Sequence, residues 1–228
     1  MTTRYATRQP ARTSSVLAVA VAAAVVVALS GARPSVGQWV LIELLGLGAV
    51  VAGVIGYRSG RQAVGVAVAL VGCLVCVGAI GGFVAGSPTL SEALRLLPGF
   101  LGLAVLTAAL VGEGSRALVK AGTGGLFAAV LLAGLFQAGE LTLLLGTAVG
   151  AIVAWDAGEH AIGVGEHLGT QASTWRCELP HIAATALVGL VGAIAIFVVR
   201  GVANDGLSLP TFAMVFVAMV LLVVALRW

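Results

Sequence analysis

Long apolar runs, separated by short polar segments, are the main pattern of this chain. Each run is rich in Ala, Leu, Val and Gly, and most are close to the length of a membrane span. A helix of about twenty residues crosses the roughly 30 Å hydrocarbon core of a bilayer, whereas a barrel strand would alternate apolar and polar side chains. We therefore predict an all-α fold, a polytopic transmembrane helix bundle that forms a single integral membrane domain over 1–228. The eight expected spans are 16–32, 39–57, 63–85, 98–111, 122–138, 141–168, 181–199 and 209–226.

Two of these spans leave an alternative open. Residues 16–29 follow a basic amino-terminal segment, which is typical of a first membrane helix but also of a signal peptide; we favour the helix. Residues 125–154 are interrupted only around Gln137 and Glu140, and one continuous helix would leave both polar side chains at mid-depth. We therefore divide this stretch into two helices. The count falls to seven spans if either alternative holds.

Two connections between spans carry local signals. Residues 87–97 are expected to form a short interfacial helix capped by Thr89 or Ser91, after which Pro98 opens the fourth span. Residues 170–180 are expected to form a polar connection before the seventh span. Close helix packing is expected at three glycine pairs: Gly82 with Gly86, Gly146 with Gly150, and Gly158 with Gly165.

Composition and charge favour a membrane protein over other classes. The chain is 60% hydrophobic and only 9% charged, with a mean hydropathy of +1.13, whereas about 25% of residues in soluble domains are charged. It contains no basic tract of the kind that binds nucleic acid. Eight spans with the amino terminus inside put nine basic residues in the cytoplasm and three outside, in agreement with the positive-inside rule. We expect a multi-pass protein of the plasma membrane with both termini cytoplasmic.

The three cysteines do not indicate a redox or metal site. Cys73 and Cys76 form a C-x-x-C spacing inside an apolar run with no His or further thiol beside it, and Cys177 is the third. Small packing residues are the simplest interpretation, so we predict neither a disulfide nor a zinc site.

The richest polar stretch is W-D-A-G-E-H-A-I-G-V-G-E-H-L-G at residues 155–169. It holds five of the chain's twelve Asp, Glu and His residues. If the stretch is helical, all five share one face about 120° wide. At 100° per residue their positions are about 0° for Asp156, −60° for Glu159, +40° for His160, −80° for Glu166 and +20° for His167.

We favour a solvated or partner-binding role for this face, on a helix that continues past Trp155 into the cytoplasmic interface and is stabilised by Arg176 and other basic residues nearby. Metal binding is the weaker interpretation, because seven residues separate His160 from His167, about 10 Å along a helix. Glu159 and His181 would have to complete such a site. We expect no metal and no cofactor.

Glu43, about one turn inside the second span, is the clearest intramembrane acid, because an ionised carboxylate among Ile and Leu is costly. We favour a structural acid, near the interface or facing the bundle, over a proton or ion site. A proton or cation path would need Glu43, Glu140 and Asp156 in line, and nothing in the sequence brings the three together.

The pattern W-D-x-G-E-x-A-I-x-x-G-E-x-L-G at residues 155–169 resembles the signature of an uncharacterised membrane-protein family of salt-loving archaea. Ala172, Thr174, Arg176, Glu178 and His181 continue the likeness, which covers about residues 150 to 190. The family has no established activity. Its members resemble accessory membrane proteins encoded beside AAA-type ATPases of the MoxR group and proteins with von Willebrand-like or transglutaminase-like domains. Positions 160 and 167 vary in the pattern, so the resemblance favours a polar network or docking surface made by Glu159, Glu166, Arg176, Glu178 and His181.

The sequence contains no Walker A loop, no G-x-S-x-G, no H-E-x-x-H and no Ser/His/Asp arrangement of familiar spacing, so we do not expect an enzyme. The leading hypothesis is a non-catalytic membrane subunit or scaffold that docks a cytoplasmic partner through residues 155–181. The resemblance suggests a MoxR-type AAA ATPase or an envelope-assembly protein as that partner. The alternative is a small ion- or proton-coupled transporter or channel. The activity, any solute and the oligomeric state stay open.

Overall fold

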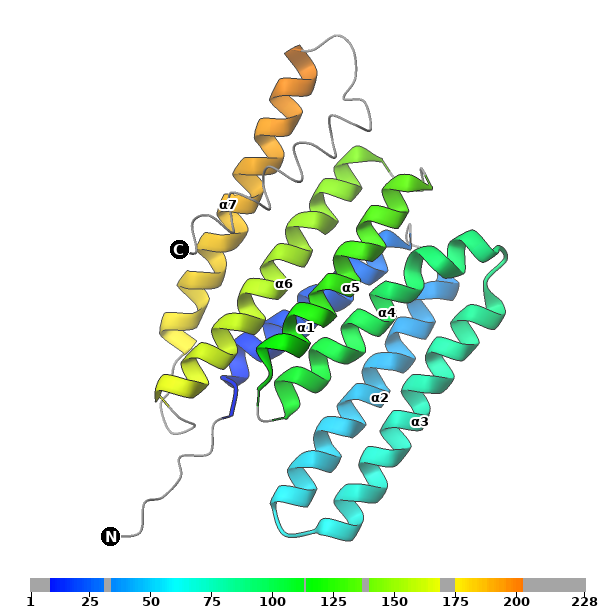
Figure 1. The fold of residues 1–228 in the computed structure, drawn as a ribbon, viewed down its shortest axis with the longest axis vertical. Helices are drawn as coiled ribbons and strands as arrows, with labels where there is room; N and C mark the ends of the chain where they lie inside the picture. The colour runs from blue at the N-terminus through cyan, green and yellow to red at the C-terminus, as the bar shows by residue number, and fades with distance from the viewer. Residues whose placement is uncertain (1–8, 31–33, 113, 137–139, 169–174, 203–228) are drawn as a thin grey trace. The chain divides into compact units, whose positions relative to one another are not determined.

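The computed structural model describes residues 9–30, 34–112, 114–136, 140–168 and 175–202, and these ranges contain seven helices (Figure 1). The helices are α1 (Arg12–Leu29), α2 (Pro34–Arg58), α3 (Gln62–Gly86), α4 (Leu90–Val111), α5 (Arg116–Leu135), α6 (Leu141–Leu168) and α7 (Trp175–Val202). Six of them, α1 to α6, are long and apolar enough to cross a membrane. The expected all-helical, membrane-type fold is therefore confirmed, whereas the expected count of eight spans is not.

The chain divides into two units, 1–189 and 190–228, and the boundary falls within α7. The first unit holds α1 to α6 and the beginning of α7. Of the second unit, only the end of α7 lies within the described residues. The expected eighth span at 209–226 lies outside them.

The first unit is built from three helix pairs: α2 with α3, α4 with α5, and α1 with α6. In Figure 1, α2 and α3 run side by side as a hairpin, and α1 lies behind α4, α5 and α6. The beginning of α1 meets the end of α6, because the Ala11 N–H donates to the Ala161 carbonyl at 2.8 Å. The Arg58 guanidinium at the end of α2 donates to the Gly112 carbonyl after α4 at 3.3 Å.

These contacts define one end of the first unit, which we call the polar end. It comprises the beginnings of α1, α3, α5 and α7 and the ends of α2, α4 and α6. Gly60, between α2 and α3, has a φ of 88°, and Gly114, shortly before α5, has a φ of 81°; such backbone conformations are readily adopted only by glycine.

Glycines allow the backbones of paired helices to approach closely. A Cβ atom at Gly122 of α5 would lie 2.6 Å from the Leu106 nitrogen of α4, and one at Gly53 of α2 would lie 2.5 Å from the Ala69 nitrogen of α3. Real Cβ atoms do not come this near. Small residues at such positions are typical of helices packed in a membrane, where dispersion contacts replace the hydrophobic driving force.

The glycine pairs expected from spacing are used unequally. Gly82 faces the indole ring of Trp39, and a Cβ at Gly86 would lie 3.9 Å from the same ring. A Cβ at Gly150 would lie 2.6 Å from the Val25 side chain of α1. A Cβ at Gly146 would meet no atom of the described residues within 4 Å, so close packing is shown only for Gly150 of this pair.

The fourth span differs from its prediction. Thr89 does cap a helix, accepting a hydrogen bond from the Glu92 N–H at 3.2 Å, but that helix is not a separate interfacial segment. It continues through Pro98 to Val111 as α4. Proline removes one backbone hydrogen bond, and a helix packed on its neighbours tolerates that loss. Proline at this position therefore interrupts the hydrogen-bond ladder without ending the helix.

The beginning of α7 is also corrected. Residues 175–180, which we expected to belong to a polar connection, form the first turns of α7, and Pro180 lies inside that helix. The polar character of Glu178 does not prevent helix formation, because its side chain is satisfied by a contact with α1 that the sequence pattern does not reveal. In the stretch 125–154, α5 ends at Leu135 and α6 begins at Leu141.

The core of the first unit is centred on α4. Of the six membrane-type helices, α4 has the most buried apolar stretch: 56% of its 18 residues are buried. The rings of Phe83 and Phe100 stack between α3 and α4 with centroids 4.6 Å apart. Buried threonine hydroxyls are satisfied within their own helices: Thr107 and Thr123 each donate at 2.8 Å to the carbonyl four residues earlier. These two threonines therefore lie in the interior at little electrostatic cost.

Candidate functional site

The polar stretch of α6 lies between two neighbouring helices. The helix runs without interruption from Leu141 past Trp155 to Leu168, so the expected helical continuation is present. Its polar side chains, however, reach α5 on one side and the beginning of α7 on the other. We treat these contacts and the adjoining contact with α1 as the candidate site.

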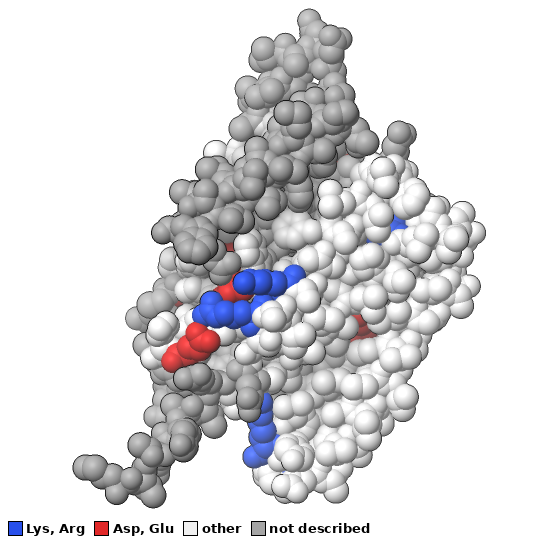
Figure 2. Space-filling view, in the orientation of Figure 1, with Lys and Arg blue, Asp and Glu red and all other residues white. Residues whose placement is uncertain are grey.

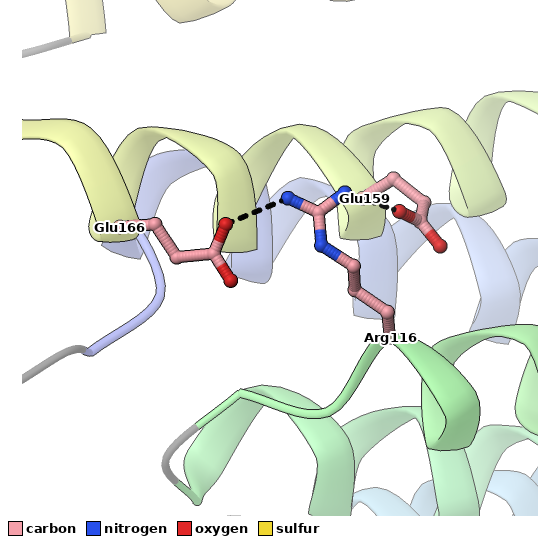
Figure 3. A network of polar contacts seen from close by, with 3 residues as sticks. All are labelled: Arg116, Glu159 and Glu166. Carbon is pink, nitrogen blue, oxygen red and sulfur yellow. Dashed lines mark hydrogen bonds and ion pairs between the residues drawn. The ribbon is translucent and has the colours of Figure 1, made fainter. Parts of the chain in front are cut away.

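Arg116, the first residue of α5, bridges two acids of α6 (Figure 3). Its Nη1 donates to Glu159 Oε2 at 3.0 Å and its Nη2 donates to Glu166 Oε2 at 2.8 Å. The acids are seven residues apart, about 10 Å along the helix, and the planar guanidinium has donors on separate nitrogens that can reach both. The Glu159 side chain is 11% exposed, whereas those of Glu166 and Arg116 are 40% and 43% exposed. The site therefore has a shielded half and a half open to solvent.

Asp156 joins α6 to α7. Its Oδ2 lies 3.1 Å from His181 Nε2 and accepts a hydrogen bond from the Thr185 hydroxyl at 2.7 Å. The ring of His160, one turn after Asp156, stacks on the ring of His181 with centroids 4.2 Å apart. The four side chains form one cluster on the α6–α7 side.

Glu178 joins α7 to α1. It is buried, and its Oε2 accepts hydrogen bonds from the Ser14 backbone N–H at 2.6 Å and from the Ser14 hydroxyl. Ser14 lies in the first turn of α1, where backbone N–H groups have no partner within the helix, and Ala11 at the cap position supplies no side-chain acceptor. The Glu178 carboxylate therefore caps α1 from another helix.

The opposite face of α6 is packed just as closely. A Cβ at Gly158 would lie 3.0 Å from the Val119 side chain of α5, and one at Gly165 would collide with the Gln9 carbonyl. Ala157 and Ala161 are fully buried. The predicted close approach of backbone at Gly158 and Gly165 is thus present, and α6 is enclosed on both faces.

Of the two roles expected for this face, solvated or partner-binding, the structure shows that solvation is only partial. Glu159 and Asp156 are used in contacts with α5 and α7, while Glu166 and His167 keep substantial exposure. Glu140 lies exposed before the first residue of α6, and Glu43 lies buried on α2, so neither belongs to the cluster.

Arg176, the expected stabilising cation, lies in the first turn of α7, but its side chain is outside the described part of the structure. Among the described side chains, Arg116 holds the two acids.

Three residues of the site escaped the sequence analysis. Arg116 had a usable signal, because the positive-inside distribution puts it at the same membrane face as the acids of α6. Ser14 and Thr185 gave no sequence signal of a role in the site, since a hydroxyl in an apolar helix usually bonds to the backbone of its own helix.

The geometry gives little support for a metal centre. Within the described ranges no group of three His, Cys, Asp or Glu residues is placed to hold an ion. His160 is occupied by stacking on His181, and His167 lies two turns further along α6. Cys76 is buried, and its thiol lies 3.7 Å from the Glu43 backbone carbonyl in a weak hydrogen bond.

Charged side chains gather in one patch on the face of the molecule shown in Figure 2, where Lys and Arg lie directly beside Asp and Glu on a surface that is otherwise largely uncharged. The Arg116 bridge itself combines both signs of charge, one guanidinium and two carboxylates. Exposed ion pairs of this kind add little stability, about 0–1 kcal/mol each. Their more important property is a fixed arrangement of charge at the surface.

Comparison with known proteins identifies a family but no function. No curated protein and no solved structure matches the chain significantly. The family of unknown function DUF7519 matches residues 63–223, which include α3 to α7 and all of the α5–α6–α7 contacts described above. Because this match extends over most of its length, the chain belongs to the DUF7519 family.

Proposed function

We propose that this protein is a non-catalytic membrane subunit that docks a cytoplasmic protein at its polar end, through residues 155–181 and the beginning of α5. The observation that carries the proposal is the arrangement of Arg116, Glu159 and Glu166, a partly exposed set of opposite charges held between two apolar helices. Docking needs such a fixed polar surface, because fixed charges give a partner register and specificity.

The distribution of basic residues supports a cytoplasmic location for the polar end. Most of the described basic residues lie at or near it, and Arg95 lies near the opposite end, in the first turns of α4. Those at or near the polar end are Arg12, Arg58, Arg61, Arg116 and Lys120. Cytoplasmic segments of membrane proteins carry such an excess of Lys and Arg.

Rigidity of the patch also supports docking. Three links fix the helix ends around it: the Arg116 bridge, the Asp156–His181 pair and the Glu178 cap on α1. A surface that is ordered in advance loses less conformational entropy when a partner binds. Lys120 and His167 add exposed charge or polarity nearby, and their side chains form no hydrogen bond or ion pair with any described residue, so these side chains are available to a partner.

The proposed partner is a soluble protein with a surface of mixed charge. The sequence resemblance suggests a MoxR-type AAA ATPase or an envelope-assembly protein, and we retain that suggestion as part of the proposal.

Site-specific variants would test docking without breaking the internal contacts. The double variant Lys120→Glu/His167→Glu changes two exposed side chains that hold no described helix, and Glu140→Lys changes an exposed acid at the other end of α6. We expect affinity purification from native membranes to recover the same partner with wild type and Glu140→Lys, and at least about tenfold less with the double variant, a difference of about 1.4 kcal/mol. Equal recovery with all three proteins would contradict the proposal.

The transport alternative requires Glu43, Glu140 and Asp156 along one path. Glu140 directly precedes α6, whereas Asp156 lies near the middle of that helix, sixteen residues or about 24 Å further along, and is engaged by His181 and Thr185. The geometry of the described residues therefore favours docking over a continuous ion path.

A further inference from the structure

Glu43 lies deep in the membrane-type part of the bundle. It is the tenth residue of α2, about 13 Å from the beginning of the helix and about 22 Å from its end at Arg58. Its side chain is fully buried, as is that of Val40 one turn earlier, and Leu47 one turn later is 7% exposed. Of the two positions left open by the sequence, interface or bundle interior, the structure selects the interior.

Neither carboxyl oxygen of Glu43 has a hydrogen-bond partner among the described residues. The Cys76 thiol donates to the Glu43 backbone carbonyl and not to its carboxyl group. A carboxylate in such surroundings would lose its hydration without any compensating cation or donor, at a cost of several kcal/mol. The neutral acid avoids this cost, so the closed bundle favours a Glu43 that carries a proton.

The helix that carries Glu43, α2, packs closely along its length on α3. In α2 and α3, Gly46 lies against Gly72 and Gly53 lies against Gly65, and these close backbone contacts bind the two helices into one hairpin. In the apolar 18-residue stretch of each helix, 28% of α2 and 22% of α3 is buried, against 56% of α4. The hairpin is therefore packed less extensively in the bundle than α4 is.

We propose that Glu43 is a proton-binding site: a carboxylic acid that is neutral in the closed bundle and exchanges its proton when the α2–α3 hairpin separates from α1 and α4. The ligand is a single proton. The site differs from the polar end in position and in chemistry. The Glu43 carboxyl group has no hydrogen-bond partner among the described residues, whereas Asp156, Glu159 and Glu166 of α6 each contact a basic or hydroxyl side chain. It is independent of the docking proposal.

Infrared spectroscopy of the protein in lipid bilayers tests both parts of this inference. In mildly alkaline buffer, the difference between wild type and Glu43→Gln is expected to contain the carbonyl band of one protonated carboxylic acid. Transfer to heavy water is expected to shift that band, because the acid proton exchanges for deuterium. A difference spectrum with ionised-carboxylate bands would overturn the proposal, and a protonated band that does not shift would show a sealed structural acid and overturn the exchange.

A hydrophobic carbodiimide gives an independent chemical test. The acid O–H adds across one C=N bond of the carbodiimide: the carboxyl oxygen bonds to the central carbon, the proton passes to nitrogen, and the product rearranges to a stable N-acylurea with no leaving group. We expect one added carbodiimide on the peptide that contains Glu43 and loss of that label in Glu43→Gln. Glu140, which is exposed to solvent, serves as the internal control and is expected to stay unlabelled. Labelling of Glu140 alone would count against a protonated Glu43.

Because Gln has the shape and neutrality of the protonated acid, Glu43→Gln is expected to fold, and its thermal unfolding in detergent would confirm that before either measurement. Loss of partner recovery in the docking experiment would leave the infrared result untouched, so failure of one proposal can be told from failure of the other.

Discussion

Ser14 of α1 donates its backbone N–H and its hydroxyl to the same carboxylate oxygen of Glu178, although 164 positions separate the two residues in sequence. The N–H groups in the first turn of a helix have no intrahelical acceptor and lie at the positive end of the helix dipole. Glu178 supplies both an acceptor and a negative charge. One buried carboxylate thus fixes the beginning of α7 to the beginning of α1.

Removal of this cap should destabilise the protein. We expect Glu178→Ala to lower the free energy of unfolding by about 2 kcal/mol, because it leaves buried donors of Ser14 without their charged acceptor. Ser14→Ala should cost less, since the Ser14 backbone N–H stays bonded. The measurement is reversible unfolding in mixed detergent micelles. Glu140→Ala, at an exposed position, is the control and should change stability by no more than about 0.5 kcal/mol.

The two halves of the Arg116 bridge should differ in strength. Glu159 is the more shielded acid, so Glu159→Gln is expected to cost about 1–2 kcal/mol, whereas Glu166→Gln at a 40% exposed position should cost about 0.5 kcal/mol or less. Added salt should reduce the smaller effect further, because it screens exposed charges first. Unfolding experiments at low and high ionic strength measure the cost of each variant and its dependence on salt. Equal costs for the two variants would show that burial does not distinguish the pairs.

Arg116→Lys should not be a conservative change. A single ammonium cannot donate to two acids about 10 Å apart on α6 as the guanidinium does. We expect the loss in Arg116→Lys to be close to that of Arg116→Gln, measured by the same unfolding experiment. Full stability of Arg116→Lys would mean that only the net positive charge matters.

Two neighbouring glycines of α5 provide a matched test of helix packing. A Cβ at Gly122 would lie 2.6 Å from the Leu106 nitrogen, while one at Gly124 has nothing within 4 Å. Gly122→Ala should therefore destabilise by about 1–3 kcal/mol through forced separation of α4 and α5. Gly124→Ala should be neutral or stabilising by up to about 1 kcal/mol, because Ala is the better helix former. If both variants lose stability equally, the close α4–α5 contact is not what holds the helices together.

Orientation in the membrane can be tested with single cysteines in a background where Cys73, Cys76 and Cys177 are replaced. Ser59 lies in the turn between α2 and α3 at the polar end, and Thr89 lies exposed at the other end, before α4. In right-side-out vesicles an impermeant maleimide should label Thr89→Cys at once and Ser59→Cys only after permeabilisation. The reverse pattern would put the polar end outside and remove the basis for a cytoplasmic partner.

Local helix geometry let the sequence predict much of the candidate site. A rotation of 100° per residue separates Glu159 and Glu166 from Asp156 and His160 on the face of α6. In the structure the first two acids contact α5 and the other two residues contact α7. The angular grouping is a property of one helix, so it could be read from residue spacing alone.

The partners of those side chains could not be predicted from residue spacing. Arg116 lies 43 and 50 positions from its two acids, and Glu178 lies 164 from Ser14. Contacts over such distances depend on which helices pack side by side, and nothing in the spacing of a single helix specifies its neighbours. The membrane-type helices and the polar face therefore follow from the sequence, because backbone geometry and hydrophobicity act locally. The continuity of α4 through Pro98, the enclosure of α6 and the burial of Glu43 depend on helix packing, which only the tertiary structure determines.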